Sequence, residues 1–243
     1  MKIRRIILRI VGIAACAGMI AGAVDFFRRK GQKHKHKPYG AYEHFIKRPL
    51  DAFLATGALI IFSPVLLTLT IIGAIEMKGN PFFTQERPGW NEKIFKLIKF
   101  RSMNSAKDEN GVLLPDLQRI TGYGRFLRNT SLDELPELIN IIKGDMSIVG
   151  PRPLLVKYLD RYNEEQHHRH DVRPGLTGYA QVHGRNSVNW EERFKMDLKY
   201  VRKITFRGDL KLIFETVLTI FDREGINSES TSKYTMPEFE GNK

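Results

Sequence analysis

Two adjacent acidic residues, Asp133 and Glu134, are the side chains whose types and spacing best suit chemistry. They lie in the stretch Thr130 to Pro153, which has the sequence TSLDELPELINIIKGDMSIVGPRP. Ser131 and Glu134 have the Ser-x-x-Glu spacing of a capping box at a helix start, where the helix dipole favours anions. Acidic residues gather at helix starts for stability alone, so the spacing by itself favours a cap over a reactive pair.

The segment that follows adds an arginine on a stiff backbone. The apolar run Leu138 to Ile142 predicts a short helix, Gly144 is typical of its end, and Met146 to Val149 resembles a strand. Arg152 then lies between two prolines, which restrict the backbone on both sides. A guanidinium held in this way suits bidentate binding of phosphate, and a surface salt bridge is the alternative.

Composition limits the possible partners. The chain has 243 residues, a formal net charge of +12 and a sequence pI near 9.8. Such a charge suits anionic lipid headgroups, phosphorylated substrates or nucleic acid. Cys16 is the only cysteine, which excludes an intramolecular disulfide and a paired-cysteine metal site.

Two motifs carry a resemblance to a known family. SLDELPELINIIKGDMSIVGPRPLL resembles the signature of the bacterial sugar transferases, small monotopic phosphoglycosyl transferases that act on polyprenol phosphate. Further along, YNEEQHHRHDVRPGLTGYAQVHGRN is similar to the bacillosamine-type members that serve bacterial N-glycosylation. The similarity extends from about Phe45 to the C-terminus. Tyr179 and His183 depart from the tryptophan and asparagine typical of that pattern.

The resemblance implies an activity and roles for individual residues. The expected reaction transfers a sugar 1-phosphate from a UDP-sugar, such as UDP-diacetylbacillosamine, to undecaprenyl phosphate and releases UMP. Asp133 is the expected nucleophile that forms a covalent phosphosugar, and Glu134, with Asp133, is expected to hold Mg²⁺. Phosphoryl transfer depends on neutralised phosphate charge, which a basic site provides. The expected substrate-binding residues are Lys99, Arg101, Arg128, Arg152 and Arg173.

Two other functional classes are open. One is a relative that binds lipid or nucleotide without turnover, and the intact Asp133-Glu134 pair argues against it. The other is a membrane-tethered nucleic-acid binder, which the positive charge alone suggests. No recognisable nucleic-acid motif is present, so we expect no nucleic-acid partner.

The first forty residues form an expected extension with an apolar segment. The run Ile10 to Val24 is flanked by basic residues on both sides, and the basic residues are more densely spaced after the run than before it. A cleaved signal peptide is one interpretation. The positive-inside rule favours the other, an uncleaved anchor with its N-terminus outside, although the run is short for a full span.

A second apolar element, within residues 41–78, has a break in its middle. Ala52 to Ile75 carries no charge and contains Ser63-Pro64. A kinked spanning helix is one interpretation. Basic residues flank both ends, which favours entry and return on the cytoplasmic face, and the resemblance implies such a re-entrant helix with its bend at Ser63-Pro64. Lys47 and Arg48 are the expected contacts to lipid headgroups, and ordinary positive-inside flanking is the alternative.

Residues 79–227 are expected to form a cytoplasmic catalytic domain at the bacterial inner membrane. We predict a hairpin around Arg87-Pro88-Gly89 that places Lys99 and Arg101 on one strand face. We also predict a helix after Pro153 that ends at exposed histidines, and an apolar stripe from Leu210 to Phe221 that forms core or lies in the membrane interface. Residues 228–243 are expected to be a loosely ordered tail. The fold class is therefore α/β, mainly α and membrane-associated, with short strands and interfacial helices.

Overall fold

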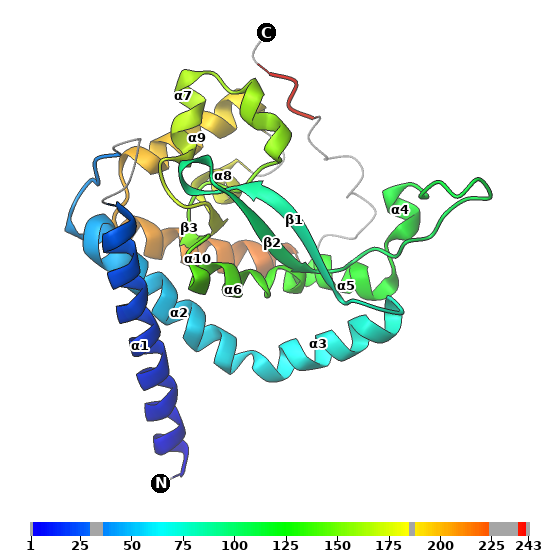
Figure 1. Ribbon diagram of the computed structural model, residues 1–243, viewed down its shortest axis with the longest axis horizontal. Helices are drawn as coiled ribbons and strands as arrows, with labels where there is room; N and C mark the ends of the chain where they lie inside the picture. Colours follow the sequence, from blue (N-terminus) through cyan, green and yellow to red (C-terminus); the bar gives the residue numbers. More distant parts are fainter. Residues whose placement is uncertain (1, 30–35, 185–187, 224–237, 242–243) are drawn as a thin grey trace.

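The computed structural model describes residues 2–29, 36–184, 188–223 and 238–241. It is mainly helical, with short strands, as expected (Figure 1). The longer helices are α1 (Lys2–Arg29), α2 (Lys47–Ile61), α3 (Ser63–Glu76), α5 (Gly122–Thr130), α6 (Glu137–Lys143), α9 (Trp190–Arg202) and α10 (Phe206–Arg223). The short helices are η1 (Tyr42–Ile46), η2 (Trp90–Glu92), α4 (Asp116–Arg119), η3 (Leu132–Glu134), η4 (Val156–Arg161), α7 (Glu164–His167), η5 (His168–His170) and α8 (Tyr179–His183).

Two small sheets complete the fold. Strands β1 (Phe82–Pro88) and β2 (Ile94–Phe100) form an antiparallel hairpin in which Phe83 pairs with Lys99. This confirms the predicted hairpin, but Arg87 and Pro88 belong to β1, the turn lies at η2, and Arg101 follows the end of β2. Strands β3 (Ser147–Val149) and β4 (Gly175–Thr177) pair in parallel, with Ser147 opposite Gly175. The second sheet therefore joins the Pro-Arg-Pro turn to a segment that follows it by more than twenty residues.

The second apolar element is bent where the sequence predicted. Helices α2 and α3 meet at Phe62 at an angle of 64° (Figure 1). Pro64 lies in the first turn of α3, where it tolerates its missing N–H, and the Ser63 hydroxyl donates to the Ile60 carbonyl at 2.7 Å. Serine and proline therefore end one helix and begin the next, as the Ser63-Pro64 prediction required.

Helix α1 packs against the beginning of α2. Gly18 and Gly22 face Pro49 so closely that an added Cβ on either would lie 2.8 Å from a Pro49 atom. The segment Ile3–Arg28 is long and apolar enough to cross a membrane, and the bent pair α2 and α3 also passes this test when it is taken as one span. In Figure 1, α1 and the bent pair leave the rest of the fold on the same side.

One hydrophobic core connects the bent helix pair to the stretch Thr130 to Pro153, which contains the acidic pair. Its buried members come from α2, β2, α6 and the residue before β3, and they are Ala55, Leu97, Leu138, Ile141 and Met146. The predicted short helix is confirmed as α6, which ends at Gly144 with φ of 88°. Because α2 and α6 share this core, the apolar element and the acidic stretch are held in one unit.

The structure corrects two expectations about the C-terminal half. The helix expected from Pro153 to His170 is broken into η4, α7 and η5, because Tyr162 is extended and Asn163 begins a new helix with a capping box to Gln166. His168 is exposed as expected, but His167 is half-buried and His170 is only 3% exposed. Burial, reinforced by Arg169, lowers the pKa of His170 to about 2, so its ring is neutral.

The tail is also partly ordered. Phe239 is 4% exposed and packs on aromatic residues of η4 and α9, which is contrary to the expected loose tail. The remainder of the predicted tail, residues 228–237 and 242–243, lies outside the described residues.

Candidate active site

A cavity of about 1100 Å³ lies between the β1–β2 hairpin, η3 and the helices α5, α8, α9 and α10. It brings together residues that are far apart in the sequence. Of those predicted to act on substrate, six line it: Lys99, Arg101, Arg128, Asp133, Glu134 and Arg152. The acidic pair therefore faces a cationic wall in a single hollow.

The backbone around the acidic pair differs from a capping box. Ser131 has a left-handed conformation with φ of 56°, ends α5 and begins η3, and makes no side-chain cap. Asp133 and Glu134 lie in η3, and the next helix, α6, begins only at Glu137 after Pro136. The capping-box prediction is therefore wrong. The physical reason is that the Glu134 carboxylate is bound by basic side chains from other elements instead of a backbone amide.

Glu134 is held as a carboxylate by two cations. Its Oε1 accepts from Lys99 Nζ at 2.6 Å and from Arg152 Nη2 at 3.2 Å. Burial alone raises the pKa of Glu134, but Arg152 and Lys99 outweigh burial and lower the pKa to about 2. Glu134 is thus ionised at neutral pH, and it fixes the orientation of both basic side chains.

Asp133 has a different environment. No hydrogen bond or ion pair of its carboxylate occurs within the described parts of the chain. Burial and the nearby Glu134 raise its pKa, while Lys99, Arg128 and Arg152 oppose this rise. A carboxylate that is partly buried, close to cations and not bound by them suits nucleophilic attack on an anionic phosphate.

Sequence reasoning missed Glu137. This residue is 3% exposed, and its Oε1 lies 3.1 Å from Lys99 Nζ, so one lysine lies between two glutamates. Burial, followed by the charge of Glu134, raises the pKa of Glu137 to about 7. The signal in the sequence is the spacing of three between Glu134 and Glu137, which places both on one side of a helical turn.

Three further arginines of the cavity were missed by sequence reasoning. Arg87 lies on the hairpin face that also carries Phe83 and Gln85, because alternate residues of a strand share one face. Arg119 of α4 and Arg193 of α9 complete this group. Among the predicted cations, Arg128 Nε donates to Ser102 Oγ at 2.9 Å, which holds it beside the loop after β2.

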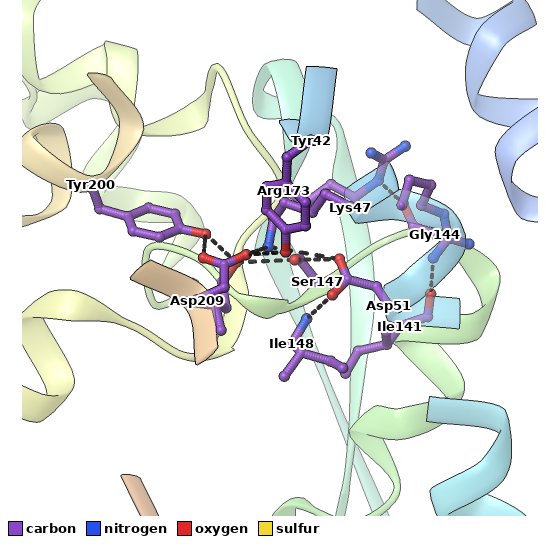
Figure 2. Close-up of polar contacts among 12 residues, drawn as sticks. Tyr42, Lys47, Asp51, Ile141, Gly144, Ser147, Ile148, Arg173, Tyr200 and Asp209 are labelled. Carbon is purple, nitrogen blue, oxygen red and sulfur yellow. Dashed lines mark hydrogen bonds and ion pairs between the residues drawn. The ribbon is translucent and has the colours of Figure 1, made fainter. Parts of the chain in front are cut away.

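Arg173, a predicted substrate contact, lies outside this cavity. Its guanidinium donates from Nε to the Gly144 carbonyl at 2.9 Å (Figure 2). It also pairs with Asp25 of α1 and lies 4.4 Å from the centre of the Trp90 ring. The side chain is 8% exposed. Arg173 therefore joins α1 to the rest of the fold and does not line the cavity that holds the acidic pair, so its predicted contact with substrate stays a prediction.

Lys47 and Arg48, the predicted headgroup contacts, are also used internally. Lys47 Nζ lies 2.6 Å from Asp209 Oδ2, and Arg48 donates to the Ile141 and Ile142 carbonyls at 2.7 and 2.8 Å (Figure 2). Both residues are at most 9% exposed. These contacts satisfy carbonyls at the end of α6 and a carboxylate at the start of α10. The structure places both residues at an internal joint, which leaves little of either side chain for a lipid.

The same joint includes Asp51 and Ser147. Asp51 Oδ2 accepts from Ser147 Oγ at 2.6 Å, and Asp209 accepts from the hydroxyls of Tyr42 and Tyr200 at 2.8 Å each (Figure 2). Buried carboxylates are tolerated only when they are paired and hydrogen-bonded in this way. The network fixes α2 against β3, the strand that leads to Arg152.

Magnesium is the cofactor expected at the acidic pair. No group of three or more histidine, cysteine or acidic side chains able to hold a metal is found in the described residues. Mg²⁺ commonly uses only one or two protein carboxylates and completes its shell with water and substrate phosphate. The unbonded carboxylate of Asp133 beside Glu134 fits this donor set, so these two residues could hold the ion together with a bound phosphate.

Comparison with known proteins identifies similar sequences. A family model described as bacterial sugar transferase matches residues 42–223. The chain is 43% identical to "Uncharacterized sugar transferase EpsL" of Bacillus subtilis over 81% of this chain and 96% of that protein. It is 39% identical to UDP-glucose:undecaprenyl-phosphate glucose-1-phosphate transferase of Escherichia coli, over 76% of this chain but only 42% of that protein. It is 38% identical to undecaprenyl-phosphate galactose phosphotransferase of Salmonella typhimurium, over 74% of this chain and 41% of that protein.

Proposed function

This chain belongs to the bacterial sugar transferase family, and on that premise we propose that it moves a sugar 1-phosphate from a UDP-sugar to undecaprenyl phosphate and releases UMP. The printed names of the Escherichia coli and Salmonella relatives describe reactions of this class. The observation that carries the proposal is the unbonded Asp133 carboxylate beside Glu134, Lys99 and Arg152 in a cation-lined cavity.

The proposed reaction has two displacements at one phosphorus atom. In the first, an Asp133 oxygen bonds to the phosphorus that carries the sugar, the bond to the UMP phosphate breaks, and UMP leaves with the electron pair. In the second, a phosphate oxygen of undecaprenyl phosphate bonds to the same phosphorus, and the bond to Asp133 breaks. A covalent intermediate of this kind divides one difficult exchange into two easier steps.

The basic residues of the cavity neutralise the phosphates. Arg152 and Lys99 are oriented by Glu134, and Arg101 and Arg128 line the same wall. Positioned cations stabilise the charge that develops as a phosphoryl group is transferred. Glu134 and Asp133 would hold a magnesium ion, which would supply Lewis-acid stabilisation of the phosphate charge.

The acceptor is a lipid, so the site must lie at a membrane surface. Large apolar side chains are exposed along the bent pair and α10, including Ile61, Leu67, Ile75, Phe206, Leu210 and Phe214. Leu212, on the other face of α10, is 4% exposed and packs in the core. Helix α10 therefore has one face for the core and one for the membrane interface, the two roles expected for its apolar stripe. This pattern supports a re-entrant α2–α3 pair, an interfacial α10 and α1 as an anchor, with the catalytic unit on the cytoplasmic face of the inner membrane.

An N-acetylated amino sugar, such as diacetylated bacillosamine, is the sugar that we propose. The support comes from residues 162–186, whose sequence is similar to the bacillosamine-type members of the family. Within that segment the rings of Tyr179 and His183 stack with centroids 4.2 Å apart, at the two positions where the chain departs from the pattern. Close to them, Gln181 and Val182 line the cavity.

The test is UMP release from a panel of UDP-sugars by the full chain in detergent, with undecaprenyl phosphate and Mg²⁺. Asp133→Asn removes the nucleophile, and Asp160→Asn is the matched control because Asp160 is exposed and does not line the cavity. We expect UMP release beyond one equivalent per enzyme to require the lipid, and all UMP release to be abolished only by Asp133→Asn. Equal release by wild type and Asp133→Asn would disprove the nucleophile. Binding of UDP-sugar or lipid without release by wild type would favour the alternative, a non-catalytic relative.

A further inference from the structure

The C-terminal tip of the chain is seated on the helical unit that follows the Pro-Arg-Pro turn. Figure 1 shows this terminal segment in red, at the end of the molecule opposite to α1. Phe239 is 4% exposed, and its ring lies 5.1 to 5.8 Å, centre to centre, from each of four other aromatic rings. These rings belong to Tyr158, Tyr162, Trp190 and Phe194.

Polar contacts fix the same tip. Glu238 Oε1 lies 2.6 Å from Lys157 Nζ and 3.1 Å from Arg161 Nη1. Arg161 also donates to the Phe239 carbonyl, and the Phe239 amide donates to the Tyr158 hydroxyl at 3.3 Å. A buried aromatic ring with a bonded backbone on both sides indicates a specific seat for this segment, because scattered surface contacts would leave the ring exposed.

The seat is connected to the cavity by Arg169. Its guanidinium lies 5.8 and 5.7 Å from the ring centres of Tyr162 and Phe194, two of the rings that hold Phe239. It pairs with Asp197 at 2.8 Å, and both side chains are 2% exposed. Its Nη2 also donates to the Arg152 carbonyl at 2.7 Å. From that backbone the Arg152 side chain reaches Glu134 at 3.2 Å.

We propose that Arg169 and Phe239 are positioning residues of the transferase site. Phe239 fixes the rings of Tyr162 and Phe194, these rings hold Arg169 in place, and Arg169 fixes the backbone from which Arg152 reaches Glu134. The inference rests on the proposed function, in which Arg152 neutralises a phosphate. Small displacements matter here, since a shift of about 1 Å in a catalytic arrangement can reduce a rate by roughly 100-fold.

The first experiment compares UMP release by wild type, Phe239→Ala, Phe239→Leu and Arg169→Lys, each assayed well below its melting temperature. We expect Phe239→Ala and Arg169→Lys to lower kcat by about tenfold. Phe239→Leu should restore most of the rate, because leucine refills the seat. A lower melting temperature with unchanged kcat would show a merely structural role and overturn the proposal.

The second experiment tests whether the effect passes through Arg152. Phe239→Ala is combined with Arg152→Ala and, as the matched control, with Arg128→Ala, whose side chain bonds Ser102 and is not part of this chain of contacts. We expect no further loss of rate in the Arg152→Ala background and the full loss in the Arg128→Ala background. Equal losses in both backgrounds would overturn the proposal and leave the proposed function intact.

A measurement without turnover separates the two proposals. The Gly175 amide donates to the Pro151 carbonyl at 3.0 Å, and the Gly150 amide donates to the Thr177 carbonyl at 2.9 Å. Both bonds are made by residues directly before Arg152, whose carbonyl Arg169 binds. Phe239→Ala should therefore accelerate hydrogen exchange of these amides. Unchanged exchange would overturn the positioning role. Faster exchange in a protein that never releases UMP would support the positioning of Arg152 and disprove the proposed function.

Discussion

The ammonium nitrogen of Lys99 lies 2.6 Å from the carboxylate of Glu134, so a strand and a helical turn 35 residues apart meet at the centre of the cavity. The contact neutralises Glu134 next to an unbonded Asp133. It therefore accounts for two neighbouring acidic residues with different environments: one is bound by cations, and the other is available for reaction.

Replacing Lys99 should reveal its role in catalysis. Lys99→Met removes one of the two cations that hold Glu134, so the pKa of Glu134 should rise from its value of about 2. We expect UMP release to fall by about 10²- to 10³-fold, which is the usual cost of removing a group that stabilises charge in the transition state. Lys96→Met is the matched control, because Lys96 lies on the same strand with an exposed side chain. Comparable losses in the two variants would contradict a specific role for Lys99.

Glu137 should make the protein less stable as the pH rises. Its pKa is raised from 4.5 to about 7, so the folded state binds this proton more tightly than the unfolded state. Its unfavourable contribution is absent below pH 4.5, grows up to pH 7 and is constant above that. Glu137→Gln should therefore raise the free energy of unfolding by about 1 to 3 kcal/mol at pH 8 and leave it nearly unchanged near pH 4.5. Thermal unfolding of both proteins across this range checks the prediction, and a difference that is independent of pH would refute it.

His170 should make the protein sensitive to acid. Burial, then Arg169, lowers its pKa from 6.5 to about 2, so only the unfolded state takes up this proton as the pH falls below 6.5. Stability is complete above pH 6.5 and is lost progressively below it, at about 1.4 kcal/mol per pH unit. His170→Asn does not titrate, and its melting temperature should decline less than that of wild type between about pH 7 and pH 5. Parallel declines would show that other groups govern acid unfolding.

The pair of Asp25 and Arg173 should support α1 and contribute little to substrate binding. Both side chains are at most 8% exposed, so Arg173→Met breaks a buried ion pair by removing one of its partners, at a cost of about 3 to 5 kcal/mol. We expect a lower melting temperature in detergent and a KM for the UDP-sugar within about twofold of wild type, since the pair lies outside the cavity. Asp25→Asn should lower the melting temperature in the same direction. A large rise in KM with unchanged stability would instead restore Arg173 as a substrate contact.

Local patterns in the sequence were sufficient for several features. Ser63-Pro64 predicted the bend between α2 and α3, and Gly144 predicted the end of α6. The turn residues between two runs rich in aromatic and β-branched residues predicted the hairpin of β1 and β2. Each of these features depends on the backbone preferences of a few neighbouring residues, and those preferences can be read from residue types and their spacing. The acidic pair and the cations Lys99, Arg101, Arg128 and Arg152 of the cavity were also identified, because they lie in motifs that resemble the family, whereas Arg87, Arg119 and Arg193 were missed.

The partners of charged side chains were decided only by the tertiary structure. Arg173 was expected at substrate and pairs with Asp25, which is 148 residues away, while Lys47 was expected at lipid and pairs with Asp209. The seat of Phe239 gave no local signal of its importance, and the only signal for Glu137 was its spacing of three from Glu134. A buried charge must find an opposite charge or a hydrogen bond, but its type and spacing do not say which of many distant groups folding brings beside it. The sequence by itself therefore predicted the reactive residues and determined several local elements, and packing decided which cations face the cavity and which hold the fold together.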